Sequence, residues 1–183
     1  DALARNFMEG AYSYARLYPN SSSFEGIKEK NKDNIVYSIQ DATSYYLNFN
    51  LDRKSYKFTS KTSDAEKKST QEAVLNKNFR QAINFAYDRT AYGAQSQGED
   101  GATKILRNLV VPPTFVTVGG KDFGAVVSEK MVNYGKEWQG MNFADAQDPY
   151  YNPEKAKAKF AEAKKELEAK GVTFPIHLDK TIE

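Results

Sequence analysis

The side chains that carry most enzyme chemistry are scarce in this sequence. Its 183 residues include one histidine, His177, and no cysteine, so the histidine and thiolate combinations typical of zinc sites cannot be assembled. Serine hydrolysis needs a serine held by a base and an acid, and no Gly-x-Ser-x-Gly segment occurs. We therefore predict that the chain is not an enzyme and that it uses neither a metal nor a cofactor.

Charged and glycine-rich segments have ordinary explanations. Gly119-Gly120-Lys121 lacks the spacing of a phosphate-binding loop, and Glu99 and Asp100 lie in a polar segment where carboxylates are usually solvated. The 26 basic and 24 acidic side chains are mixed along the chain, so no basic stripe is available to follow a nucleic-acid backbone. No segment approaches the roughly 20 apolar residues that a membrane span requires.

One alternating pattern favours ligand binding. In residues 44–51 the side chains alternate between two faces of a predicted strand, and one face carries Tyr46, Asn48 and Asn50. Tyrosine and asparagine can hydrogen-bond a peptide backbone without reading its side chains. An ordinary solvent-exposed face would show the same pattern, so the pattern alone leaves both interpretations open.

The elements that must position this strand are a mixture of helices and strands. Apolar spacing and capping residues predict helices at 2–9, 21–32, 75–86, 123–138 and 153–170, with a break at 95–101. Period-two alternation predicts strands at 12–18, 34–40, 44–51 and 174–178. The polar segment 53–69 is expected to be an exposed loop. This order of elements predicts a mixed α/β (α+β) architecture.

Four segments, in order along the chain, resemble the family 5 extracellular solute-binding proteins. Residues 46–50, Tyr-Leu-Asn-Phe-Asn, resemble the strand that enters the second lobe, and residues 78–89 resemble the signature helix Val-Arg-Gln-Ala-Ile-x-Tyr-Ala-x-Asp-Arg. Residues 109–114 resemble the Leu-Ile-Pro-Pro loop, and residues 151–159 resemble the Tyr-Asp-Pro-Glu-Lys-Ala-Lys segment that opens the next helix. The composition looks most like the oligopeptide-binding lipoproteins of Gram-positive bacteria, particularly the streptococcal ones.

The resemblance implies a two-lobed fold of the class II periplasmic-binding-protein type, of which only part is present. Residues 1–43 would then be a late part of lobe I that ends at the hinge crossover, near residues 41–45. Residues 44–183 would be the first part of lobe II. The acidic residue that holds the amino terminus of a bound peptide in such receptors would lie beyond Glu183.

The same resemblance implies a function. The chain would belong to the substrate-binding subunit of an ABC importer, which captures extracellular oligopeptides by hinge closure and delivers them to the membrane permease. Tyr45, Tyr46, Asn48 and Asn50 are the candidate peptide-binding residues, whereas Arg80 and Asp88 are expected to hold helix ends and neighbouring loops. The receptor is expected to be a monomer on the extracellular face of the cell membrane, held by a lipid anchor outside this sequence.

Two alternatives remain open from the sequence. A receptor of the same fold could carry a nickel complex, heme or a sugar in place of a peptide. Alternatively, the protein could serve as a surface peptide sensor or adhesin, in which transport is secondary. Neither alternative requires a catalytic residue.

Overall fold

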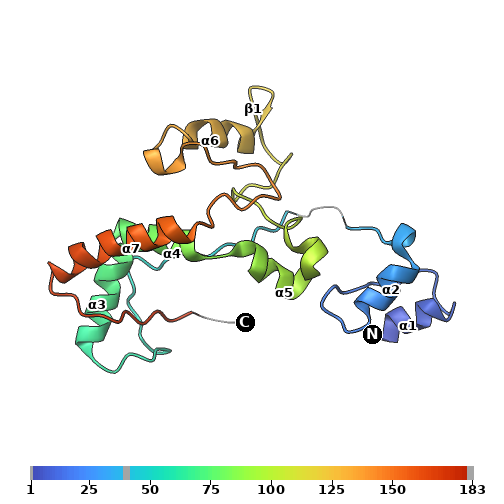
Figure 1. The fold of residues 1–183 in the computed structure, drawn as a ribbon, viewed down its shortest axis with the longest axis horizontal. Coiled ribbons are helices and arrows are strands. Elements are labelled where there is room, and N and C mark those ends of the chain that lie inside the picture. The colour runs from blue at the N-terminus through green and yellow to red at the C-terminus, as the bar shows by residue number, and fades with distance from the viewer. Residues whose placement is uncertain (1, 39–41, 181–183) are drawn as a thin grey trace. The chain divides into compact units, whose positions relative to one another are not determined.

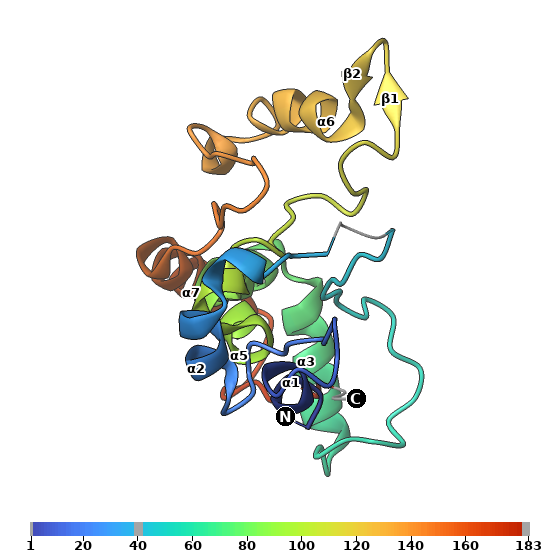
Figure 2. The ribbon, with the colours of Figure 1, turned by 90° about the vertical axis from the view of Figure 1, so that its right-hand side faces the viewer.

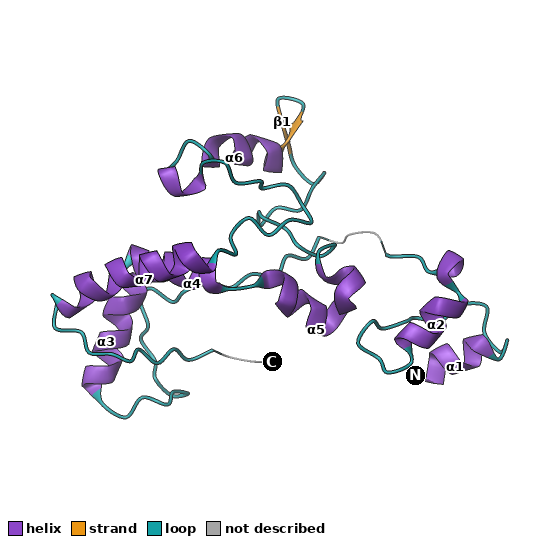
Figure 3. Cartoon of the chain, viewed as in Figure 1, coloured by secondary structure: helices purple, strands orange, loops and turns teal. Residues whose placement is uncertain are grey.

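The computed structural model describes residues 2–38 and 42–180. Across these residues the regular secondary structure is almost entirely helical, with one short two-stranded sheet (Figures 1 and 3). The α-helices and strands are α1 (Ala2–Met8), α2 (Phe24–Lys30), α3 (Asp64–Leu75), α4 (Lys77–Ala86), α5 (Arg89–Ala102), β1 (Thr117–Val118), β2 (Lys121–Asp122), α6 (Phe123–Met131) and α7 (Pro153–Glu168). Single 3₁₀ turns occupy Lys32–Asn34 and Lys136–Trp138. This mixture of helix and a small sheet agrees with the predicted mixed architecture.

The chain divides into two compact units. The first comprises Asp1–Tyr45 and Asp88–Pro149, and the second comprises Tyr46–Tyr87 and Tyr150–Glu183. Residues 88–149 therefore pack with the N-terminal segment, although the sequence resemblance assigns them to the same lobe as residues 44–87. That assignment concerns the lobes of a larger receptor and stays a prediction.

The second unit is built on α4 and α7, which pack against each other and against α3. Phe79 of α4 lies 6.5 Å from the ring of Phe160 on α7, and Phe160 in turn meets Phe174 edge to face at 5.9 Å. Leu167 is fully buried at the end of α7. The buried cluster consists of Ala73, Phe79, Ala163, Leu167 and Val172. On α4 the buried Phe79, Ala82 and Phe85 recur at three-residue spacing, and on α7 Ala163 and Leu167 lie one turn apart, which is why the two helices bury these faces.

Capping side chains set the helix starts in the second unit. Asn152 caps α7 with Pro153 in its first turn, as the sequence predicts, because proline needs no hydrogen-bond acceptor there. Asn76 caps α4, because its side chain accepts a hydrogen bond from the amide of Phe79. Ser63 and Glu66 form a reciprocal capping box at the start of α3.

The first unit contains α1, α2, α5, α6 and the sheet. Lys28 of α2 forms an ion pair with Asp100 of α5. Within α5 the chain bends at Gly98, where φ is +67°. A larger residue there would place its Cβ only 3.0 Å from Pro19, so both the backbone conformation and the close packing favour glycine. Figure 2 shows β1 and β2 as an antiparallel hairpin that leads directly into α6.

Several predicted elements are wrong. In the described part of the chain, residues 12–18, 34–38, 44–51 and 174–178 form no strand, and residues 39–40 lie outside it. Alternating side chains suit a strand, but a strand also needs a neighbour to complete its hydrogen-bond ladder, and none of these segments has one.

Three predicted boundaries also differ from the structure. The predicted loop 53–69 ends early, because the capping box at Ser63 starts α3 at Asp64. The predicted break at 95–101 is only the bend inside α5, and the predicted helix 123–138 ends at Met131 before a separate 3₁₀ turn.

Candidate functional site

The four predicted peptide-binding residues lie on an extended stretch without secondary structure. Tyr45 is 94% exposed and Tyr46 is 69% exposed, and Asn48 and Asn50 are also exposed. Tyr45 ends one compact unit, whereas Tyr46, Asn48 and Asn50 begin the next. They are neighbours in the sequence, and the side chain of each is exposed.

Hydrogen bonds hold this stretch at both ends. Ser44 Oγ donates to the carbonyl of Val110 at 2.5 Å within the first unit. In the second unit, Gln71 Nε2 of α3 donates to the carbonyl of Leu51 at 2.6 Å. Asn50 Oδ1 accepts from the amide of Asp52 at 3.1 Å, which closes a tight turn, so Asn50 has a local structural role as well as an exposed side chain.

The carboxylate of Asp179 accepts hydrogen bonds from several residues of loop 53–61. Arg53 Nη1 donates to Asp179 Oδ2 at 2.6 Å, and Lys61 Nζ donates to the same oxygen at 2.8 Å. Thr59 Oγ1 donates to it at 2.7 Å, while the amide and hydroxyl of Ser60 donate to Oδ1, each at 3.3 Å. Loop 53–61 is therefore fixed to the C-terminal segment of the second unit.

The Asp179 cluster is partly buried. The side chain of Lys61 is fully buried, and those of Arg53 and Asp179 are 20% and 19% exposed. The hydrogen bonds from Lys61 and Arg53, together with that from Thr59, hold the pKa of the Asp179 carboxyl well below its usual range. The buried charge is that of Lys61. Removing its partner Asp179 would leave this charge buried and unpaired, which is strongly destabilising.

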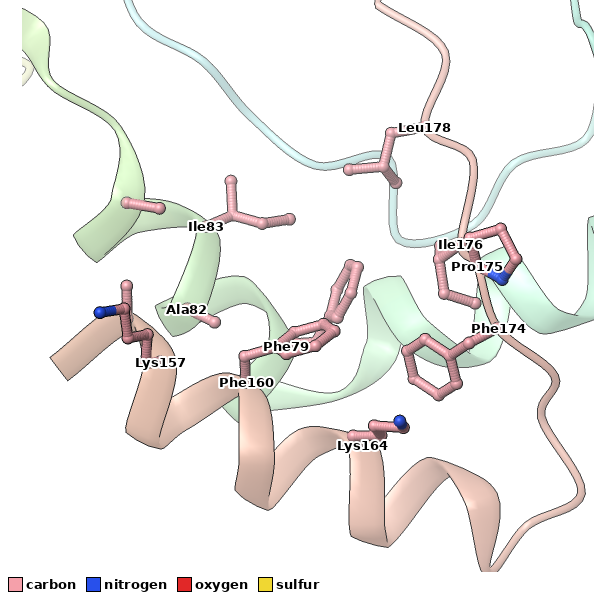
Figure 4. Close-up of a pocket in the computed structure, with 12 residues that line it drawn as sticks. Phe79, Ala82, Ile83, Lys157, Phe160, Lys164, Phe174, Pro175, Ile176 and Leu178 are labelled. Carbon is pink, nitrogen blue, oxygen red and sulfur yellow. The ribbon is translucent and has the colours of Figure 1, made fainter. Parts of the chain in front are cut away.

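An apolar groove lies on the second unit between α4, α7 and residues 174–178 (Figure 4). It encloses about 700 Å³. Figure 4 shows the rings of Phe79, Phe160 and Phe174 near its centre, with Ile83 of α4 and Leu178 of the C-terminal segment above them in this view. The groove offers apolar contact, and its lining includes none of the four predicted binding residues.

Arg80 and Asp88 hold helix ends, as the sequence predicts. Arg80 Nη1 donates to the carbonyls of Val74 and Leu75 at 2.7 and 2.8 Å, which satisfies the last turn of α3. Asp88 Oδ1 accepts from the amide of Ala91 at 2.8 Å and caps α5. Both residues of the signature segment are therefore structural.

Arg89, the last residue of that segment, was not singled out in the sequence, yet it anchors a longer network. Its guanidinium donates from Nε and Nη2 to Asp148 Oδ1 at 3.0 and 2.7 Å, and its amide donates to Asp148 Oδ2. Nη2 also donates to Asn108 Oδ1 at 2.9 Å. The Asp148 carboxylate thus joins α5 to the segment before α7 within the first unit.

Among the described residues, His177 and the carboxylates form no metal-binding group. The side chain of His177 is exposed, and the backbone carbonyl of His177 accepts a hydrogen bond from Thr70 Oγ1 at 3.3 Å. Residues 2–38 and 42–180 contain no group of three or more potential ligands that could hold a metal ion. Within the same ranges, no helix combines the length and apolar character that a bilayer crossing needs.

Comparison with known proteins relates the chain to peptide receptors. It is 80% identical over all 183 residues to "Oligopeptide-binding protein AliB" of Streptococcus pneumoniae. It is 59% identical over 180 residues to AliA of the same species and 56% identical over 180 residues to SarA of Streptococcus gordonii, both also named oligopeptide-binding proteins. No protein-family model matches the chain.

These relatives confirm the resemblance to streptococcal oligopeptide-binding proteins found in the sequence, since AliB, AliA and SarA are all named as such. The similarity covers 100% of this chain but only 28% of AliB, and 98% of this chain but only 27% of AliA. The chain therefore spans less than a third of the length of the curated relatives that it matches.

The Asp179 cluster escaped sequence reasoning. Its basic members lie in a polar segment that the sequence describes only as a loop, and Asp179 lies 126 residues from Arg53 and 118 residues from Lys61. No local spacing relates residues that far apart. Residue type alone would have predicted an exposed Lys61, because lysines are usually exposed, whereas the structure buries its side chain.

Proposed function

We propose that the chain forms part of the substrate-binding subunit of an ABC importer that captures extracellular oligopeptides. The observation that carries this proposal is the 80% identity, over every residue of the chain, to a protein named for oligopeptide binding. The sequence supports it independently, since it lacks the residue combinations of common enzyme sites and carries the family segments in order.

The proposed receptor has two lobes that close around an extended peptide, with a crossover near residues 41–45. The boundary between compact units after Tyr45 is consistent with such a crossover. Backbone hydrogen bonds would supply affinity, and roomy pockets would accept varied side chains. Tyr46 and Asn48 suit the first role because their polar groups are exposed on an extended chain.

The proposed partners follow from this role. The closed, peptide-loaded form would be recognised by the permease of the importer on the extracellular face of the membrane. A lipid anchor outside this sequence would hold the receptor there, and the receptor would act as a monomer. No catalytic step is part of the proposal.

Native mass spectrometry of the protein at the full length of its relatives tests the ligand class. We expect peptides of several residues to be released on denaturation and to be replaced by added peptides. A metal chelate, a heme or a sugar in the cleft, with no response to peptides, would refute the peptide assignment and leave the family intact.

The candidate residues can be tested in the same protein. We expect Tyr46→Ala and Asn48→Ala each to weaken peptide binding by about 3- to 10-fold, because each removes one hydrogen-bonding group worth about 1 kcal/mol. Tyr134→Ala removes an equally large tyrosine, 83% exposed, outside the candidate stretch. Isothermal titration calorimetry with one peptide should show wild-type affinity for this control, and equal losses in all three variants would contradict the assignment.

A further inference from the structure

The stretch 46–50 needs an external anchor if its side chains are to meet a ligand in a fixed geometry. It forms neither helix nor strand, and Tyr46 and Asn48 are exposed. An unanchored stretch would lose conformational entropy on binding, which lowers affinity. The hydrogen bond from Gln71 to Leu51 fixes one point directly after it, and the residues that follow must fix its direction.

Arg53, three residues after Asn50, supplies that direction. Its guanidinium donates from Nη1 to Asp179, from Nε to the carbonyl of Ser55 at 2.9 Å, and from Nη2 to the carbonyl of Phe58 at 3.3 Å. It also lies 4.3 Å from the centre of the Tyr56 ring. One side chain therefore folds the loop onto itself and ties it to Asp179.

Lys61 closes the loop at its other end on the same carboxylate. Its buried ammonium group donates to Asp179 Oδ2, so both ends of loop 53–61 converge on Asp179. Asp179 follows Leu178, and the preceding residues Phe174 and Ile176 pack against the buried cluster of α3, α4 and α7. The carboxylate is thus joined to the core of the second unit by the segment that bears it.

We infer that Asp179, acting through Arg53 and Lys61, is a positioning residue that fixes the stretch 46–50 for ligand contact. The order of contacts runs from the helical core to residues 174–178, then to Asp179, then to Arg53, and so to the candidate binding residues. The inference rests on the proposed function for its ligand, but the anchoring itself concerns this chain alone.

The test compares Asp179→Asn with Asp52→Asn in the protein at the full length of its relatives. Asp52 is a matched control, because it is a neighbouring carboxylate, 79% exposed, whose side chain forms an ion pair with the exposed Lys54. Hydrogen exchange followed by mass spectrometry reports the order of residues 46–60, and calorimetry with one peptide reports affinity.

We expect Asp179→Asn to accelerate amide exchange in residues 46–60 and to weaken peptide binding about tenfold, while amides of α4 and α7 keep their protection. Asp52→Asn should change neither quantity by more than about twofold. Asp179→Glu, which keeps the charge, should recover part of both losses.

Three results separate the possible failures. Unchanged exchange in residues 46–60 would overturn the inference, as would faster exchange without loss of affinity in a protein that binds peptides. A wild-type protein that binds no peptide would refute the proposed function, while exchange would still decide the anchoring. If Asp179→Asn fails to fold, Arg53→Lys removes the guanidinium that donates to Asp179, Ser55 and Phe58 and keeps the charge, and the same two measurements apply.

Discussion

At the scale of single residues, several charged side chains complete the hydrogen bonds of the backbone at helix ends. Arg80 binds the last carbonyls of α3, and Asp88 binds an amide at the start of α5. Glu66 binds the amides of Thr62 and Ser63, both at 2.9 Å, at the start of α3. These groups determine where helices begin and end, so their substitution should alter stability before it alters binding.

Glu66 gives a prediction about acid stability. The amides of Thr62 and Ser63, with their hydroxyls, lower the pKa of Glu66 from 4.5 to about 2. Because the folded state favours the ionised form, this contribution is complete above pH 4.5 and is lost as the pH falls toward 2. Glutamine preserves a capping box but does not titrate, so Glu66→Gln should flatten the decline in the free energy of unfolding across this range. Urea titrations at several pH values check this, and an unchanged slope would contradict it.

At the scale of elements, local signals predicted α4 and α7, whereas the start of α3 was missed although its capping box of Ser63 and Glu66 is also a local signal. Asn152-Pro153 and the apolar spacing of residues 156–167 specify α7, and α4 is specified in the same way. The predicted strands failed because alternation describes one segment, whereas a strand depends on a partner elsewhere in the chain. The Asp179 cluster was missed for the same reason, since its members meet only in the folded unit.

Leu167 tests the packing of α4 against α7. It is fully buried, and Leu167→Ala should lower the free energy of unfolding by about 2–5 kcal/mol, because it removes buried methyl groups and leaves a cavity. Leu75→Ala makes the same change at a side chain that is 50% exposed, and it should cost less than half as much. Urea unfolding monitored by circular dichroism measures both, and equal losses would show that the end of α7 is not part of the core.

At the scale of the whole molecule, the chain consists of two compact units that it enters and leaves more than once. The polypeptide passes from one unit to the other after Tyr45, after Tyr87 and after Pro149. The sequence predicted one passage, near residues 41–45, from the family resemblance. The grouping of residues 88–149 with the N-terminal segment depends on contacts such as the Lys28–Asp100 ion pair, which no periodicity in the sequence reveals.

This division leads to a prediction about cooperativity. If each compact unit has its own core, Leu167→Ala should accelerate hydrogen exchange mainly in Tyr46–Tyr87 and in residues 150–180, and should leave α2 and α5 nearly unchanged. Exchange mass spectrometry at low denaturant resolves the two sets of amides. A uniform acceleration across both sets would show that the chain unfolds as one cooperative body.

The buried ammonium group of Lys61 also determines how loop 53–61 responds to chemical and proteolytic attack. An acylating reagent needs an accessible amine, and trypsin must draw the whole lysine side chain into its own pocket. Lys54 and Lys57 are exposed and meet both requirements, whereas Lys61 meets neither while Asp179 holds it. Cleavage or acylation at Lys61 therefore reports release of loop 53–61 from Asp179. No substitution or added label is needed to observe it.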